Sequence, residues 1–202
     1  MWNLPANWCA EPPPFEPMTP TTVLILPGWQ GSGPGHWQMR WAAQQGYTVV
    51  EQDDWLRPRR GDWLARLDEV VVDTPGEGAD IVLAAHSLGC IQVAAWASVS
   101  RHTARIRGAL LVAPGDVERP DLREQIPGWT PIARQRLPFA ATLVGSRNDP
   151  YCAHQRAQDL ARDWGTRWVD LGDAGHINAD SGLGDWPQGH ALLQELMGHS
   201  RA

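Results

Sequence analysis

Ser87 lies at the centre of the pentapeptide Ala-His-Ser-Leu-Gly, between an apolar stretch at 80–85 and a helical pattern at 88–98. A sharp strand-to-helix turn leaves room only for small side chains two residues before and after such a serine, and Ala85 and Gly89 meet that need. The hydroxyl then points out of the sheet and can act as a nucleophile. A serine that caps the N-terminus of the helix is the alternative interpretation.

Two further polar residues follow predicted strands later in the chain. Asp149 comes shortly after the strand 139–145, and His176 comes shortly after the strand 167–171. A histidine can take and return the proton of a hydroxyl near neutral pH, and a carboxylate can hold the imidazole in the tautomer that this requires. Alone, each could be an Asp-Pro turn or a surface histidine. Together they predict acyl transfer, with Ser87 as nucleophile, His176 as general base and Asp149 as the orienting acid.

A glycine-rich loop at 27–36 directly follows the strand 22–26. A loop at this place can bring a backbone N–H to the oxygen that becomes negative during acyl transfer. We predict that Trp29 and Leu88 supply the two N–H groups, with Gln30 as the second choice for the loop. The chain contains no lysine, which excludes a Walker-type phosphate site, and the glycine spacing does not fit a dinucleotide fingerprint. We therefore expect no cofactor.

The cysteines and the other histidines offer competing chemistry. Cys9, Cys90 and Cys152 show neither a disulfide framework nor zinc spacing, and we expect reduced thiols that pack as small apolar groups rather than nucleophiles. A zinc site from His36, His86 and His176 is conceivable, but no metal-binding spacing supports it, so we expect no metal.

Three side chains are predicted to line the substrate pocket, namely Gln30, His86 and Trp129. His86 is expected to pack beside the site, because successive residues at the turn point in different directions. The polar segment 114–137, which contains Trp129, could fold over the site as a short lid, and a plain surface loop with a helical turn near 121–125 is the alternative.

The elements that must position these residues are short apolar runs that alternate with helical patterns. Strands are predicted at 22–26, 47–50, 80–85, 107–112, 139–145 and 167–171, and helices at 36–45, 61–72, 88–98, 153–164 and 188–197. Continuous apolar strands separated by helices predict a mainly parallel sheet that is covered on both faces, which is an α/β fold. Sites in such folds form at the carboxyl ends of the strands, which is where the polar residues above occur.

Composition limits the function further. The chain has 202 residues and a net charge of −6, which favours one domain and disfavours a nucleic-acid partner. No apolar run is long enough to span a membrane, and residues 1–20 form a proline-rich segment without the pattern of a secretory signal. We predict an extended arm at 1–20, a catalytic domain at 21–202, a cytoplasmic location and a small-molecule ester substrate. Protein partners are left open.

The chain resembles the small serine hydrolases grouped with retinoblastoma-binding protein 9 and the YdeN-like α/β-hydrolases. The resemblance covers roughly residues 21–196 and is carried by four motifs: Leu-Pro-Gly-Trp followed by Ser-Gly-Pro-Gly-His-Trp at 26–37, His-Ser-Leu-Gly-Cys at 86–90, Gly-Ser-Arg-Asn-Asp-Pro-Tyr at 145–151 and Gly-His-Ile-Asn at 175–178. It implies an α/β-hydrolase fold without a large cap domain, a Ser–Asp–His triad at the positions above and esterase activity on small esters. Ala85 departs from the general hydrolase motif, which has glycine there.

These features leave three hypotheses about function. The first is an esterase that forms an acyl-enzyme on Ser87. The second is a thioesterase or amidase with the same triad, because the motifs do not encode the leaving group. The third is a partner-binding protein on a hydrolase scaffold, which would have no physical need for all three polar groups.

Overall fold

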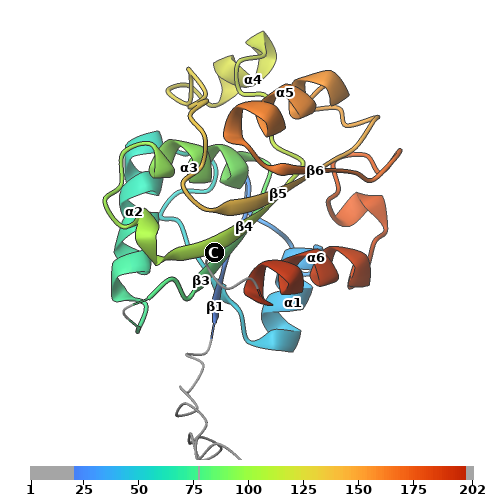
Figure 1. Ribbon diagram of the computed structural model, residues 1–202. Coiled ribbons are helices and arrows are strands. Elements are labelled where there is room, and N and C mark those ends of the chain that lie inside the picture. Colours follow the sequence, from blue (N-terminus) through green and yellow to red (C-terminus); the bar gives the residue numbers. More distant parts are fainter. Residues whose placement is uncertain (1–20, 77, 199–202) are drawn as a thin grey trace, which may run out of the picture.

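A single six-stranded sheet organises the molecule, whose computed structural model describes residues 21–76 and 78–198 (Figure 1). The strands are β1 Thr22–Leu26, β2 Thr48–Val49, β3 Ile81–His86, β4 Ile106–Val112, β5 Ala140–Gly145 and β6 Arg167–Asp170. Their order in the sheet is β2-β1-β3-β4-β5-β6, and every neighbouring pair is parallel. All carboxyl ends therefore lie at one edge of the sheet. The predicted α/β fold with a parallel sheet is confirmed.

Within the described ranges, six α-helices connect or follow these strands. They are α1 Trp37–Gln45, α2 Arg60–Asp73, α3 Leu88–Ala97, α4 Pro120–Gln125, α5 His154–Trp164 and α6 Pro187–Gly198. Five of them coincide with predicted helices to within about two residues, as expected where apolar periodicity is strong. The short helix α4 lies where the sequence suggested only a helical turn.

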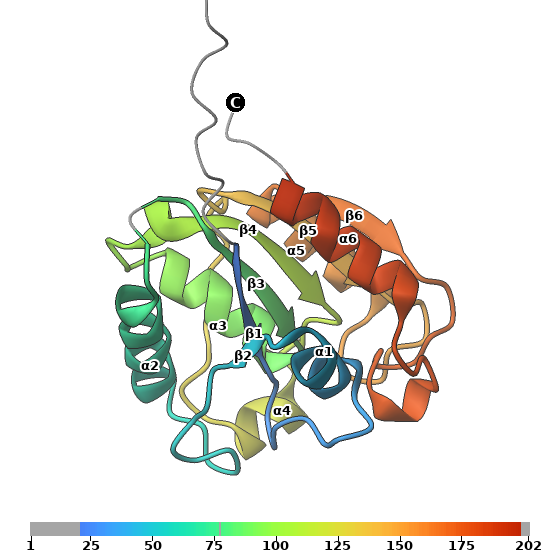
Figure 2. The same cartoon turned by 90° about the horizontal axis from the view of Figure 1, so that it is seen from below.

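The helices cover both faces of the sheet (Figure 2). Helices α1 and α6 pack on one face, where Val23 and Ile25 of β1 point. Helices α2, α3 and α5 pack on the other face, together with Leu24 and Leu26. Successive strand side chains point to opposite faces, so a sheet that is buried on both sides needs an uninterrupted apolar run. This is why the four central strands, β1, β3, β4 and β5, could be recognised from the sequence.

Residues at both ends of the chain lie outside the part that the structure describes. The predicted arm at 1–20, with Cys9, and the last residues from 199 onward lie outside the described residues. Within the described residues, no helix is both long and apolar enough to cross a membrane.

Candidate active site

Ser87 occupies a strained turn between β3 and α3. Its backbone has φ 53° and ψ −118°, a conformation that non-glycine residues rarely adopt and that costs of order 1–3 kcal/mol. The N–H of Ser87 donates to the carbonyl of Val112 in the adjacent strand β4, with an N···O distance of 3.0 Å. This bond anchors the turn at the carboxyl edge of the sheet. The hydroxyl is thereby held out of the sheet, as a nucleophile requires.

Gly89 in the first turn of α3 allows the helix to approach β1. A β-carbon at Gly89 would lie 2.4 Å from the carbonyl oxygen of Leu26 and 3.0 Å from that of Pro27. Both contacts are with backbone, which cannot move aside as a flexible side chain can. The small residue expected after the nucleophile is therefore a steric requirement of this turn.

Replacement of Gly89 by alanine should lower the free energy of unfolding by about 1–3 kcal/mol, because the added methyl group overpacks the contact between α3 and the end of β1. Urea denaturation followed by circular dichroism measures this change. Gly33→Ala is the matched control, since a β-carbon there would meet no atom within 4 Å. A Gly89→Ala protein as stable as the Gly33→Ala protein would contradict the steric argument.

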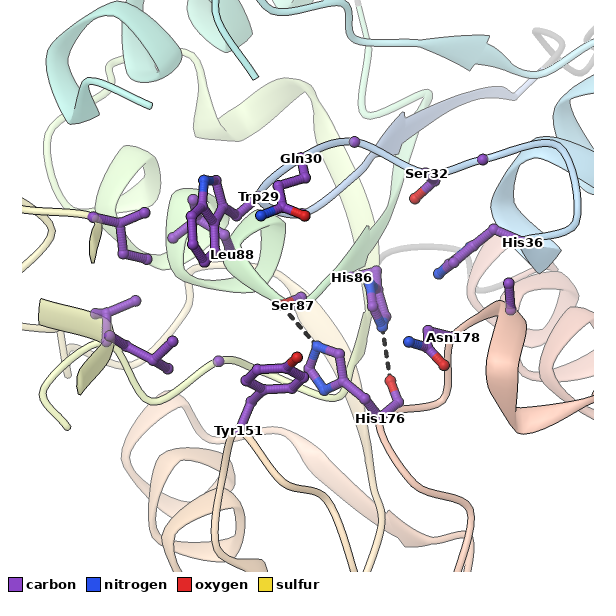
Figure 3. A pocket seen from close by; sticks show the side chains of 18 residues that line it. Trp29, Gln30, Ser32, His36, His86, Ser87, Leu88, Tyr151, His176 and Asn178 are labelled. Atoms are coloured by element: carbon purple, nitrogen blue, oxygen red, sulfur yellow. Dashed lines mark hydrogen bonds between the residues drawn. The ribbon is translucent and has the colours of Figure 1, made fainter. Parts of the chain in front are cut away.

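Hydrogen bonds join Ser87, His176 and Asp149 in a line. Figure 3 shows the bond between Ser87 and His176. The Nε2 atom of His176 lies 2.9 Å from the Oγ atom of Ser87. Its Nδ1 atom lies 2.9 Å from each carboxylate oxygen of Asp149. Because a carboxylate can only accept here, Nδ1 carries the proton and Nε2 is left to accept from the serine hydroxyl. The side chain of Asp149 is 3% exposed, so this interaction is sheltered from water.

The loop after β5 positions both Asp149 and the histidine loop. The Oδ1 atom of Asp149 accepts from the N–H of Tyr151 at 2.8 Å, which orients the carboxylate. Ser146 Oγ accepts from the N–H of Ala174 at 3.0 Å, and Asn148 Oδ1 accepts from the N–H of Gly175 at 2.7 Å. Ser146 and Asn148 were not among the predicted site residues. Two loops far apart in the sequence are thus tied together next to the imidazole.

His86 and His36 form a second layer beside His176. The Nε2–H of His86 donates to the backbone carbonyl of His176 at 2.9 Å, and the two rings meet edge to face with centroids 4.8 Å apart (Figure 3). Burial, with the nearby imidazoles of His176 and His36, lowers the pKa of His86 well below its usual value. Burial, followed by the effect of His176, lowers the pKa of His36 to about 4. Both rings are therefore neutral near pH 7.

The hydrogen bonds that His176 makes with Asp149 and Ser87 argue against a zinc site at His36, His86 and His176. The rings of His36, His86 and His176 lie in a row, with the first two centroids 4.7 Å apart. Both nitrogens of His176, however, are engaged by Asp149 and Ser87. In this arrangement His176 has no lone pair to give to a metal ion without breaking the line of hydrogen bonds.

The candidate oxyanion donors differ in whether their backbone N–H groups already have a hydrogen-bond acceptor in the protein. The N–H of Gln30 donates to the carbonyl of Trp55 at 3.0 Å, so this second choice is already engaged. Leu88 is the first residue of α3, where helical N–H groups have no partner within the helix. Over the described ranges, neither Leu88 nor Trp29 uses its backbone N–H in a protein hydrogen bond. These two groups are the ones that remain available for a ligand oxygen.

The glycine loop is held close to the nucleophile. A β-carbon at Gly28 would lie 2.8 Å from the β-carbon of Ser87, so the backbone just before Trp29 touches the serine. The indole N–H of Trp29 donates to the carbonyl of Leu56 at 3.0 Å, which fastens the loop from its outer side. The loop can therefore present its backbone to a carbonyl carbon bound at Ser87.

A cavity of about 320 Å³ opens over Ser87 and His176. Gln30 and His86 line it, as the sequence suggested. Tyr151, which the sequence did not single out as a site residue, also lines the cavity and packs edge to face on His176 with centroids 4.6 Å apart. Its neighbour Asp149 carried the only chemical signal in that segment, and nothing in the sequence alone marks the direction of the Tyr151 ring.

Trp129 does not line the cavity, and its predicted place in the pocket is wrong. Its side chain is fully buried, its Nε1–H donates to the carbonyl of Pro58 at 2.9 Å, and its ring packs against Trp63. A tryptophan in a polar loop has the same local sequence whether it covers the core or a pocket. From the segment 114–137 the cavity instead receives Gly115, Val117, Leu122 and Ile126.

The two described cysteines do not compete for the role of nucleophile. Cys90 and Cys152 are buried, and neither lines the cavity. Burial raises the pKa of the Cys90 thiol far above its usual value and raises that of Cys152 to about 12. Both thiols therefore stay protonated near neutral pH, and only a thiolate is an effective nucleophile.

Comparison with known proteins places this arrangement in a family. The family model described as serine hydrolase matches residues 23–195. A solved structure from Pectobacterium atrosepticum, described as that of a YdeN-like hydrolase, is 27% identical over 88% of this chain and 91% of that one, with a TM-score of 0.74. The ydeN gene product of B. subtilis is 19% identical over 89% of this chain and 100% of that one, with a TM-score of 0.71.

More distant structures share the fold alone. A thermophilic esterase of Thermogutta terrifontis is 15% identical over 93% of this chain and 86% of that one, with a TM-score of 0.59. A thioesterase domain from the curacin biosynthetic pathway is 18% identical over 89% of this chain and 91% of that one, with a TM-score of 0.55. A search of curated protein sequences returned no match. The family match spans most of the chain, so the resemblance inferred from the four motifs is confirmed: the chain belongs to the serine hydrolase family, with an α/β-hydrolase fold that shows no large cap in the part that the structure describes.

Proposed function

We propose that this serine hydrolase cleaves small carboxylic esters through an acyl-enzyme on Ser87. The observation that supports this most is the line of hydrogen bonds from Ser87 through His176 to Asp149, which opens into a cavity of about 320 Å³. The line joins a hydroxyl, an imidazole and a buried carboxylate in the order that nucleophilic acyl transfer uses.

In the first half of the reaction, His176 Nε2 takes the proton of Ser87 as Oγ attacks the ester carbonyl carbon. The resulting tetrahedral oxyanion accepts hydrogen bonds from the N–H groups of Trp29 and Leu88. The protonated His176 then gives its proton to the alcohol oxygen, and the bond between that oxygen and the acyl carbon breaks. Asp149 stabilises the imidazolium throughout and stays ionised.

In the second half, a water molecule takes the place of the departed alcohol. His176 takes one proton of this water as its oxygen attacks the acyl carbon, and it then returns the proton to Ser87 Oγ. The carboxylic acid leaves and the enzyme is restored. Two moderate barriers replace one high barrier, which is the benefit of a covalent intermediate.

The leaving group distinguishes this proposal from its alternatives. A thioesterase or an amidase would use the same three residues, and a partner-binding scaffold would turn over none of these substrates. The matched test compares hydrolysis of p-nitrophenyl butyrate, its thioester analogue S-(4-nitrophenyl) thiobutyrate and the corresponding anilide N-(4-nitrophenyl)butyramide by the purified protein. We expect the oxygen ester to give the highest kcat/KM after correction for the intrinsic reactivity of each compound. A higher corrected kcat/KM for the thioester would identify a thioesterase, and a higher value for the anilide would identify an amidase. No turnover of any of the three compounds would favour a partner-binding scaffold.

A further inference from the structure

The cavity has two chemically different arms that meet at Ser87. One arm is apolar and is formed by Leu88, Val117, Leu122 and Ile126. The other arm is polar and is formed by Ser32, His36, His86 and Asn178. Figure 3 shows Leu88 on one side of Ser87, and His36 and Asn178 on the opposite side. A molecule that reacts at Ser87 therefore meets a different environment on each side of its carbonyl carbon.

The polar arm carries no formal charge. None of the described residues that line the cavity is an arginine, an aspartate or a glutamate. The low pKa values of His36 and His86 keep both rings neutral near pH 7. An ionic group placed in this arm would lose its hydration without gaining a counter-charge, which is strongly unfavourable. The arm suits a polar but uncharged group.

His36 provides the arm with a hydrogen-bond donor that has no protein partner. Its Nδ1 atom accepts from the N–H of Gln38 at 3.2 Å, so the proton of the neutral ring is on Nε2. Within the part of the chain that the structure describes, this buried Nε2 has no hydrogen-bond partner. A buried polar atom without a partner is costly and gains from any acceptor that can reach it. Because the atom has almost no accessible surface, a group in the arm can accept from it only after a small shift of the His36 ring or of the atoms that cover it.

Ser32 adds acceptor capacity to the same arm. Its hydroxyl donates to the Oε1 atom of Gln38 at 2.9 Å, which leaves the oxygen lone pairs of Ser32 to accept. The side chain of Asn178 is held by its own loop, since Oδ1 accepts from the N–H of Asp180 at 3.1 Å. A group that can both accept and donate would be complementary to this arm. A hydroxyl has both capacities and no charge.

The position of His176 decides which half of an ester enters each arm. His176 must protonate the alcohol oxygen, so the alcohol lies on the side of its Nε2. In the polar arm, the ring of His86 packs edge to face on the His176 ring with centroids 4.8 Å apart, and we take this contact to place the polar arm on the alcohol side. The apolar arm lies beyond Leu88, whose N–H is a proposed oxyanion donor. The alcohol then occupies the polar arm and the acyl chain occupies the apolar arm.

From this arrangement we propose that the preferred substrates are uncharged esters that join a short apolar acid to a hydroxylated alcohol. The inference rests on the proposed esterase function and deepens it. For 2-hydroxyethyl butyrate, water adds across the bond between the acyl carbon and the ester oxygen, and butyric acid and ethylene glycol are released. The free hydroxyl of the alcohol half accepts from His36 Nε2 and is retained in the product.

Four esters test this assignment. They are 2-hydroxyethyl butyrate, the propyl butyrate that lacks its hydroxyl, the cationic butyrylcholine, and ethyl 3-hydroxybutyrate, an isomer with the hydroxyl on the acyl half. Each kcat/KM is divided by the rate constant for hydrolysis of that ester by hydroxide, which removes intrinsic reactivity. We expect 2-hydroxyethyl butyrate to exceed each of the other three by about tenfold, since a buried donor is paired only with this ester.

A His36→Asn variant tests the role of the donor. Asparagine is a good N-cap and can still accept from the N–H of Gln38, but it lacks the Nε2–H group. The variant should lose most of the preference for 2-hydroxyethyl butyrate over propyl butyrate. His102→Asn is the matched control, because His102 is exposed and does not line the cavity. It should keep the preference.

The outcomes separate this inference from the proposed function. Three results would overturn the substrate assignment. The first is corrected rates for 2-hydroxyethyl and propyl butyrate within twofold of each other, and the second is a preference for the isomer or the choline ester. The third is a preference that stays unchanged in His36→Asn. In each of these cases turnover that disappears in Ser87→Ala would leave the esterase proposal standing. Turnover that persists in Ser87→Ala would instead remove the proposed function itself.

Discussion

Replacement of Ser87 by alanine is expected to lower kcat for p-nitrophenyl butyrate by about 10⁶-fold, as when a serine nucleophile is removed from a related triad mechanism. The reason is that only the Oγ atom is lost, and with it the covalent intermediate. Alanine keeps the β-carbon of Ser87 that lies against Gly28, and it adds no atom to the turn at φ 53°. The fold should therefore be unaffected. Steady-state kinetics with freshly purified protein measure the change.

The control for this variant is Ser100→Ala. Ser100 donates to Asp68 at 2.5 Å on the α2–α3 side of the molecule and does not line the cavity. It should retain wild-type kcat and a similar thermal unfolding midpoint. If Ser87→Ala were to unfold at the wild-type temperature and still keep more than about a hundredth of the activity, Ser87 would not be the nucleophile.

Replacement of Asp149 by asparagine is expected to lower kcat by about 10⁴-fold. The two carboxylate oxygens both lie 2.9 Å from Nδ1 of His176, so they hold the proton on that atom. An amide in the same place can donate to Nδ1, which moves the ring proton to Nε2. The Nε2 atom could then no longer accept from Ser87. The rate falls because the imidazole is in the wrong tautomer, while the shape of the site is kept.

Asp170→Asn is the matched control for Asp149→Asn. Asp170 pairs with Arg147 at 2.9 Å at the same edge of the sheet but is not in contact with His176. It should retain activity within a few-fold of wild type. Equal losses in the two variants would mean that general loop disruption, and not the tautomer of His176, explains the effect.

The fold could be predicted because its four central strands, β1, β3, β4 and β5, are mostly buried. All residues of β3 are buried, and those from Ile81 to Ala85 form a continuous apolar run, which the turn at Ser87 separates from the small-residue pattern of α3. The helix α4 was harder to predict, since six residues contain too little periodicity for a firm assignment. Strand and helix ends differ by one or two residues because propensity does not set them sharply.

The site was predictable to the extent that its residues follow strand ends. Ser87, Asp149 and His176 each follow a strand at the carboxyl edge, so their meeting could be anticipated from topology. Trp129 was misplaced and Tyr151 was missed, because the direction of a loop side chain depends on contacts between distant segments. The choice between Trp29 and Gln30 as oxyanion donor needed the structure, in which the N–H of Gln30 already donates to the carbonyl of Trp55. The cytoplasmic location and the arm at 1–20 stay predictions.

Covalent labelling with a fluorophosphonate tests the central claim most directly, because the reagent needs an activated serine in a folded site. The labelled protein is digested and the modified residue is located by mass spectrometry. We predict a single adduct on Ser87, formed rapidly by the native protein, slowly by Asp149→Asn and not at all after heat denaturation. A folded protein that stays unlabelled, or that carries the adduct on a different serine, would contradict this account.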